Sequence, residues 1–310
     1  MFLETFVALS PLYFYILTGV LLRKTNVIDG EFLPAFNRLA FHAFLPLMMF
    51  LNIYEADLDF HNSIAAITYV IAAYVVLFSV LMLIVPRFIK DKPRAATAVQ
   101  AMFRSNFVLL GLLYARQLFG TDCLGEVTIL VAVIVPLFNV LAVICFTLLT
   151  GKKQSISGVL IKIMKNPLIL ATLAGFLVRA MNIELSALLL DPISTLANVA
   201  TPFVMVVIGA SLTLTGFKNE VRIIGAATVV RLVAVPLVFV TVAIFLGFRE
   251  ATLIALLTAF GGPCAASSAA MAYQLGGDGE LASQLLAVTT IFSLPTMYLL
   301  IVLLKGLGLC

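Results

Sequence analysis

The sequence predicts an all-α integral membrane protein of ten transmembrane helices, arranged as two five-helix repeats that are inverted relative to each other. Hydrophobic residues make up 63% of the 310 residues and charged residues 11%, whereas soluble chains carry roughly 45–50% and about 25%. Ten apolar stretches approach the roughly 20 residues that a spanning helix needs. In addition, the two halves of the chain align with each other at one constant shift.

The ten expected spans take up most of the chain, and short stretches that hold most of the charge separate them. The first span begins within the acidic sequence MFLE, and the basic residues Arg23 and Lys24 follow it. We therefore interpret it as a retained span and not as a signal peptide. None of the connecting stretches is long enough for a soluble domain. The expected spans are 2–22, 33–53, 63–86, 95–119, 125–149, 158–181, 190–213, 221–247, 251–275 and 280–304.

The distribution of Lys and Arg over the short loops predicts the orientation of the chain. One set of alternate loops is basic and is expected in the cytoplasm, which places both termini outside the cell membrane. The acidic loop at 54–61 then lies outside as well. The basic set holds Arg23, Lys24, Arg87, Lys90, Lys92, Arg94, Lys152, Lys153, Lys162, Lys165, Lys218 and Arg222.

An internal repeat appears when the chain is shifted by 156 residues. Residues 11–49 then match 167–205 with ten identities and no gap. A unit of five spans enters the membrane from opposite sides in its two copies, which is typical of secondary transporters. We expect a first repeat at 1–150, a cytoplasmic linker at 151–157 and a second repeat at 158–310. The less common matched pairs are Pro11–Pro167, Gly19–Gly175, Arg23–Arg179, Asn26–Asn182 and Pro46–Pro202.

The sequence FGGPCAASSAA at 260–270 places helix breakers inside the ninth span. Pro263 lacks an N–H group, and Gly262 favours unwinding. A broken helix at membrane depth is tolerated only where protein or a water-filled cavity covers the freed backbone groups. The 156-residue shift pairs Asn106 with Gly262 and Phe107 with Pro263, so we expect a matching break at 104–106 in the fourth span. A simple kink between packed helices is the alternative.

Polar side chains near these breaks predict a solute site. Arg104 and Arg231 lie inside spans four and eight, and no deep Asp or Glu neutralises them. An unpaired cation that faces a cavity suits a carboxylate, although each Arg could instead bond to backbone carbonyls or snorkel. Ser267 and Ser268 could contact the solute or serve close helix packing.

The remaining chemistry-bearing residues indicate no enzyme and no metal centre. His42, which the shift pairs with Asn198, is a candidate for proton coupling, and a histidine hydrogen-bonded inside the bundle is the alternative. The four cysteines show no metal-ligand spacing, and the spans contain no HExxH, paired aspartates or GxSxG. We therefore expect no metal, no cofactor and no nucleic-acid partner.

Five stretches together resemble the auxin efflux carrier family, whose bacterial members include malonate carriers. The resemblance implies a fold similar to bile-acid transporters and sodium/proton antiporters. In it, helices 1, 2, 6 and 7 form a scaffold and a homodimer contact, and helices 3–5 and 8–10 move past the scaffold as an elevator. The stretches are FNRLAFHAFLPLMMFLNI (36–53), FRSNFVLLGLLYARQLFG (103–120), KNPLILATLAGFLV (165–178), TPFVMVVIGASL (201–212) and AFGGPCAASSAAMAYQLGGD (259–278).

The resemblance also assigns a place to the substrate. It implies a crossing at Ser105-Asn106 and Pro263, with Asn106 matching the substrate-contacting Asn of the family. Plant members have proline where this chain has Ser105, so helix 4 is expected to be less sharply broken here.

These observations predict a secondary carrier of a small organic anion, most simply a mono- or dicarboxylate. The expected substrate contacts are Arg104, Ser105, Asn106, Arg231, Gly262, Pro263, Ser267 and Ser268. A sodium- or proton-coupled symporter or antiporter of the same fold is the first alternative, and a membrane ligand sensor that does not transport is the second. Membrane lipid surrounds the protein in each case.

Overall fold

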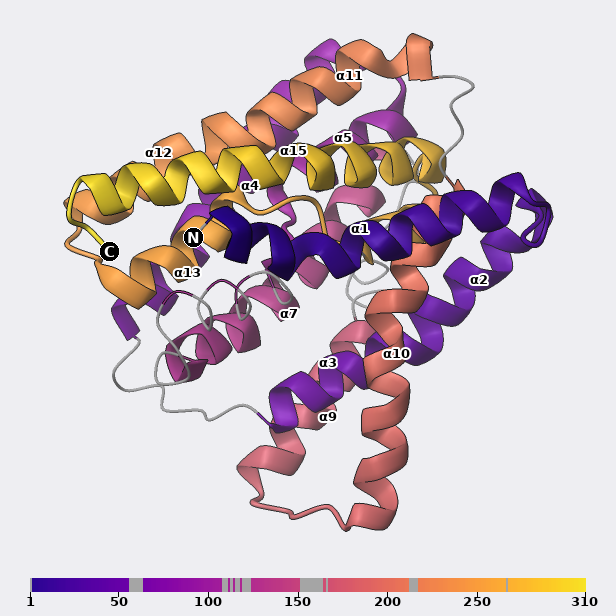
Figure 1. Ribbon diagram of the computed structural model, residues 1–310, viewed down its shortest axis with the longest axis horizontal. Coiled ribbons are helices and arrows are strands. Elements are labelled where there is room, and N and C mark those ends of the chain that lie inside the picture. Colours follow the sequence, from indigo (N-terminus) through magenta and orange to yellow (C-terminus); the bar gives the residue numbers. More distant parts are fainter. Residues whose placement is uncertain are drawn as a thin grey trace.

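The structure, a computed structural model, describes residues 2–55, 64–107, 111, 114, 118, 124–150, 164–165, 167–211, 217–265 and 267–310. Over these residues the regular secondary structure is helical, and the only β-type pairing is an isolated bridge. The elements, shown in Figure 1, are α1 (Phe2–Lys24), η1 (Gly30–Phe32), α2 (Leu33–Leu39), η2 (Ala40–Phe44), α3 (Leu45–Tyr54), α4 (Ile64–Phe88), α5 (Lys92–Phe103), α7 (Leu124–Leu149), α9 (Pro167–Ala180), α10 (Ala187–Ser211), α11 (Phe217–Val229), η3 (Val230–Ala234), α12 (Val235–Phe245), α13 (Glu250–Gly261), α14 (Ser267–Leu275) and α15 (Gly279–Gly306).

Five helical stretches in the described part of the chain are long and apolar enough to cross a membrane. Each has 21 to 28 residues, at or above the length that the hydrocarbon core requires. The predicted all-helical class is thereby confirmed, while ten spans in two inverted repeats remain a prediction. The stretches are Ile64–Phe88, Ile129–Leu149, Ala187–Ser211, Glu220–Phe245 and Gly279–Gly306.

Several helices begin and end close to the boundaries that the sequence predicts. α4 and α15 begin and end within two residues of the expected spans, and α15 starts where Asp278 accepts a hydrogen bond from Leu281 N. The sixth span was expected from 158, but α9 begins at Pro167, and 158–163 lie outside the described residues. Proline suits a first helical position because the N–H that it lacks would have no helical partner there.

One group of helices consists of α1, α3, α9 and α10. α1 packs along α10 and α3 packs along α9, and each pair meets at a glycine. A Cβ on Gly19 would lie 2.0 Å from the carbonyl oxygen of Val206, and one on Gly175 would lie 2.9 Å from that of Phe50. Glycine therefore permits backbone contact at two positions that are 156 residues apart.

The turns that follow α1 and α9 also match. Asn26 and Asn182 have φ values of 58° and 51°, in the left-handed region that Asn adopts more readily than most residues. Asn26 N bonds to Arg23 O at 3.2 Å, and Asn182 N bonds to Arg179 O at 3.0 Å. The same local geometry thus recurs at the 156-residue shift found in the sequence.

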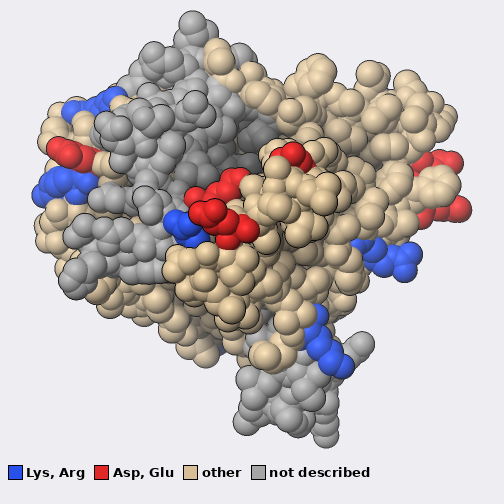
Figure 2. All heavy atoms as spheres, turned by 90° about the horizontal axis from the view of Figure 1, so that it is seen from below, with Lys and Arg blue, Asp and Glu red and all other residues tan. Residues whose placement is uncertain are grey.

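A second group contains α4, α5, α7 and the helices from α11 to α15 (Figure 1). Its centre is aromatic: Tyr74 stacks on Phe260 at 4.8 Å between ring centroids, and its edge meets Phe138 at 4.7 Å. On the face that Figure 2 shows, the surface of the described residues is mostly uncharged, with a few separate charged clusters. A membrane protein is expected to have such a surface, because its solvent over most of the area is hydrocarbon.

Ionic contacts join three helices of this group at one end. Arg94 of α5 lies 3.0 Å from a carboxylate oxygen of Glu220 in α11 and 3.4 Å from one of Asp278, which caps α15. The amino-terminal ends of α5, α11 and α15 therefore lie together, and Lys90 and Lys92 lie in the segment where α5 begins.

Candidate functional site

Two helices of the second group stop inside the protein, and their ends cross. α5 ends at Phe103 and α13 ends at Gly261. The extended residues that follow form an antiparallel bridge between Ser105 and Cys264. Asn106 N bonds to Pro263 O at 2.8 Å, and Ala265 N bonds to Arg104 O at 3.1 Å. The two chains thus satisfy some of the backbone groups that the breaks set free, which membrane depth requires.

The two breaks have different causes in the sequence. At the second, Gly262 is extended, with ψ at 158°, and a Cβ there would lie 2.6 Å from Thr258 O. Pro263 follows it and cannot continue the hydrogen-bond ladder. At the first, Arg104 is extended with neither glycine nor proline beside it. The fourth expected span is therefore interrupted after α5, although Ser105 stands in place of proline.

The register of the crossing differs from the one expected. The bridge places Ser105 opposite Cys264, and it is flanked by the hydrogen bonds from Asn106 N to Pro263 O and from Ala265 N to Arg104 O. The bridged pair is 159 residues apart, so the crossing is centred three residues away from the 156-residue shift, which pairs Asn106 with Gly262. α5 and α13 have 12 residues each and begin 158 residues apart. Most of the offset therefore arises before these helices start.

Arg231 lies under the crossing with 0% of its surface exposed. Its Nε donates to Gly262 O at 2.8 Å, and its Nη2 donates to Ala259 O at 2.8 Å. Its Nη1 donates to the carbonyls of Phe103 at 3.0 Å and of Met102 at 3.3 Å. These carbonyls belong to the last turns of α13 and α5. The guanidinium thus binds the negative ends of both half-helices, which is the backbone-bonding alternative that the sequence left open.

Arg104 occupies the other side of the crossing and is 4% exposed. Its Nη2 donates to Asn139 Oδ1 and to Ser267 Oγ, both at 2.7 Å, and its Nη1 contacts the sulfur of Met271. None of these partners is a carboxylate. The positive charge of Arg104 is therefore not neutralised by a described acidic residue.

Buried donors of Arg104, of its partner Asn139 and of the residue after Ser267 have no acceptor among the described residues. They are Arg104 Nε, Asn139 Nδ2 and Ser268 Oγ. Asn139 bonds Arg104 directly, and Ser268 follows Ser267, which also bonds it. A buried donor without a partner costs about 1–3 kcal/mol. This arrangement is complementary to an acceptor with negative charge.

No hydrogen bond or ring contact joins His42 to this cluster within the described residues. It is exposed in η2, and its Nδ1 lies 3.0 Å from Arg38 O of its own helical segment. Its ring also meets Phe41 edge-on. Asn106 does belong to the crossing, where it is buried and uses its backbone N–H on Pro263.

Sequence reasoning missed some residues of the site. Gln100 is fully buried one helical turn before Arg104, and its amide nitrogen contacts the sulfur of Met271. The i, i+4 spacing of Gln100 and Arg104 in an apolar span was a usable signal. Asn139 was missed as well, because no spacing in the sequence links it to Arg104. The described residues contain no group of His, Cys, Asp or Glu that could hold a metal ion.

Comparison with known proteins gives one finding. A family model described as membrane transport protein matches residues 5–301 of the chain. The match includes both broken helices and every residue of the cluster around Arg104. No curated protein gives a significant match.

Proposed function

The chain belongs to the membrane transport protein family, that of the auxin efflux carriers, and from this premise we propose that it is a secondary carrier of a small organic anion. The family membership and the apolar helices make it a multi-pass membrane protein. The proposed substrate class is a mono- or dicarboxylate, and the proposed binding place is the Arg104 side of the crossing.

The single observation that carries this proposal is the set of buried donors without acceptors. Arg104 Nε and Asn139 Nδ2 belong to one hydrogen-bonded pair with a positive charge, and Ser268 Oγ belongs to the residue after Ser267, which also bonds Arg104. A carboxylate offers two oxygens with about four acceptor sites, and charge-assisted bonds to a guanidinium are the stronger class. Binding such an anion would provide acceptors for these buried donors, which otherwise lose their hydrogen bonds to water without forming new ones.

The helix ends at the crossing support an anion in preference to a cation. The negative ends of α5 and α13 would attract a cation, but Arg231 already supplies one there. α14 begins at Ser267, so the positive end of a nine-residue helix lies beside Arg104. The sodium-coupled alternative would need cation ligands other than the carbonyls that Arg231 occupies.

The proposed transport step is an elevator movement of the second helix group past the first. The paired glycine contacts hold α1 to α10 and α3 to α9, which suits a fixed scaffold. The crossing lies wholly within the other group, so it could move together with its anion. We further propose a dimer contact through the scaffold, termini outside the cell membrane and a proton coupling at His42.

Uptake of labelled dicarboxylates and monocarboxylates into proteoliposomes tests the proposal. Arg104→Ala should weaken apparent anion affinity by about 30-fold or more, since removing one partner of a buried charged pair costs about 2–5 kcal/mol. Asn139→Ala should also weaken it, while the exposed Arg179→Ala serves as the matched control. Unchanged uptake by folded Arg104→Ala would remove the cluster from the substrate path.

A further inference from the structure

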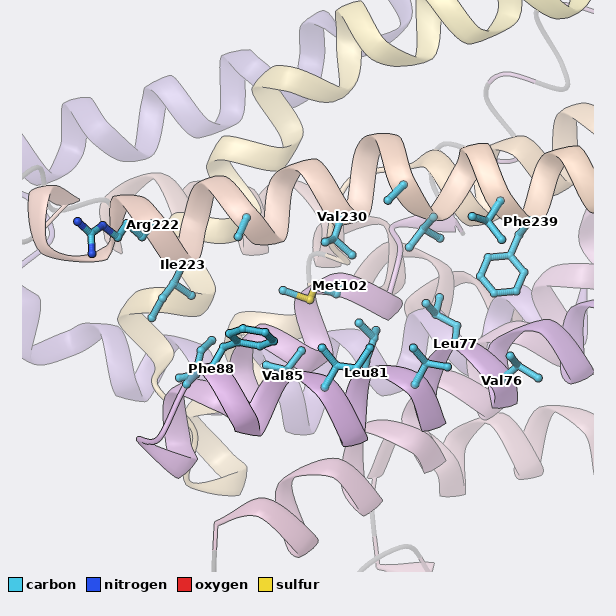
Figure 3. Close-up of a pocket in the computed structure, with 17 residues that line it drawn as sticks. Val76, Leu77, Leu81, Val85, Phe88, Met102, Arg222, Ile223, Val230 and Phe239 are labelled. Atoms are coloured by element: carbon cyan, nitrogen blue, oxygen red, sulfur yellow. The ribbon is translucent and has the colours of Figure 1, made fainter.

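A long apolar groove runs along the outside of the second helix group, away from the cluster around Arg104. Its cavity volume is about 760 Å³, and 17 residues of α4, η3 and the adjoining helices line it. α4 forms one wall with Leu77, Leu81 and Val85, and α11 with α12 forms the other (Figure 3). Met102 of α5 lies at its floor. It does not include the donors proposed for the anion.

The groove is open to the surroundings of the protein. Phe88 at its rim is 83% exposed, and Val76 and Val238 are also exposed. Both walls belong to stretches that are long and apolar enough to cross a membrane. An apolar groove in such walls has hydrocarbon as its solvent, so the chemistry of the lining favours an acyl chain.

The length of the groove matches one leaflet of a bilayer. Its α4 wall runs from Val76 to Phe88, which at 1.5 Å per residue is about 18 Å. The opposite wall, from Arg222 to Phe239, is about 26 Å long. Half of a typical hydrocarbon core is about 15 Å. A lipid chain that enters at one end can therefore lie along the groove over its whole depth.

A positive charge marks one end of this groove. Figure 3 shows Arg222 at the end where Ile223 and Phe88 lie, whereas Phe239 and Val76 lie at the opposite end. Arg222 is exposed, and no ion pair joins it to a carboxylate in the described parts of the chain. The nearby carboxylate of Glu220 forms its ion pair with Arg94.

The surroundings of that end are basic as well. The segment after Phe88 carries Lys90 and Lys92, and Arg87 is exposed one residue before it. The sequence places these residues in the basic loops that face the cytoplasm, where anionic lipid headgroups attract Lys and Arg. Among the 17 residues that line the groove, Arg222 is the only charged one.

From this arrangement we propose that the groove is a binding site for one anionic phospholipid of the adjacent leaflet. The phosphate contacts Arg222, and an acyl chain lies between α4 and α12 toward Phe239. The lipid contacts α4 and α12, which lie on either side of Met102. It therefore helps to hold together the helix group that contains the crossing. The site depends on the membrane setting alone and does not require that the carried substrate be an anion.

Competitive lipid binding tests this site. The detergent-purified protein is incubated with equal amounts of phosphatidylglycerol and phosphatidylcholine, and bound lipid is counted by native mass spectrometry. Wild type should retain several-fold more phosphatidylglycerol. Arg222→Gln should lose this preference yet keep acyl binding, whereas Arg179→Gln, an exposed arginine outside the groove, should behave as wild type.

Groove-filling variants and a free anion complete the test. Ala226→Phe places a ring in the groove and should reduce retention of both lipids, and Ala234→Phe fills the groove one turn from Val230 if the first variant fails to fold. Excess inorganic phosphate should not displace phosphatidylglycerol. An unchanged preference in Arg222→Gln, full lipid retention in the folded Phe variants, or displacement by phosphate alone would each overturn the proposal.

Discussion

At the scale of single residues, Arg231 and Arg104 lie on two sides of one crossing and have different partners. Arg231 donates to four backbone carbonyls at the ends of α5 and α13. Arg104 donates to side chains and keeps its Nε unpaired within the described structure. We infer that the first holds the two half-helices together and that the second contacts the solute.

Replacing Arg231 should therefore impair folding more than it impairs anion affinity. Arg231→Ala removes four hydrogen bonds to buried carbonyls, of which Ala259 O still accepts one from the Tyr74 hydroxyl, and hydrogen bonds to a charged group contribute about 1.5–3 kcal/mol each. The melting temperature in detergent should fall by at least about 5 °C. Arg231→Lys should restore only part of the lost melting temperature. The single ammonium group of lysine lacks the planar fork of donors with which arginine reaches both helix ends.

The matched variant Arg179→Ala removes an exposed arginine and should leave the melting temperature unchanged. If Arg231→Ala is as stable as wild type but loses anion binding, then Arg231 belongs to the solute site and our assignment is wrong.

Sequence alone could identify both arginines but not divide their tasks. Each stood out as a charge without a carboxylate at membrane depth. The partners of Arg231 are carbonyls, which every residue carries, so no pattern of side chains reveals them. Asn139 and Met271 are far from Arg104 in the chain, and only the packing of α7 and α14 brings them to it.

At the scale of elements, glycines set how closely the helices of the first group pack. Gly19 of α1 lies against the backbone of α10, and Gly175 of α9 lies against that of α3. Gly225 in α11 has open space where a Cβ would point. The three glycines lie in helices, so they share the same intrinsic penalty relative to alanine.

Substitution by alanine separates packing from helix propensity. Gly19→Ala would place a Cβ 2.0 Å from Val206 O, so α1 and α10 must separate and the melting temperature should fall. Gly175→Ala should lower it less, because its nearest contact is 2.9 Å. Gly225→Ala should hold or raise stability, since alanine gains about 1 kcal/mol over glycine in a helix. Equal effects at all three positions would contradict the close contacts.

The repeat in the sequence predicted this pairing of Gly19 with Gly175, together with that of Asn26 with Asn182. It did not predict the three-residue offset at the crossing, because an alignment at one constant shift allows no gap between the matched stretches. The sequence also did not predict the two π-helical segments, η2 and η3. η2 and η3 each end two residues before a proline, Pro46 and Pro236, and a wider turn is one way in which a helix accommodates the missing N–H.

At the scale of the whole molecule, the two helix groups differ in what they contain. The group of α1, α3, α9 and α10 holds the close glycine contacts, and the other group holds the crossing, both buried arginines and the apolar groove. α1 begins and α15 ends toward the same side of the view in Figure 1. The composition of the sequence predicted the membrane setting, but the division of labour between groups depends on contacts between distant segments.

The central claim is that the unpaired donors around Arg104 bind a carboxylate. An experimental structure of the protein in lipid nanodiscs with a saturating dicarboxylate tests it most directly. We predict one carboxylate group within hydrogen-bond distance of Arg104 Nε and of Asn139 Nδ2 or Ser268 Oγ, with Arg231 still on the helix carbonyls. A dicarboxylate bound elsewhere, with those donors still unpaired, would contradict the claim.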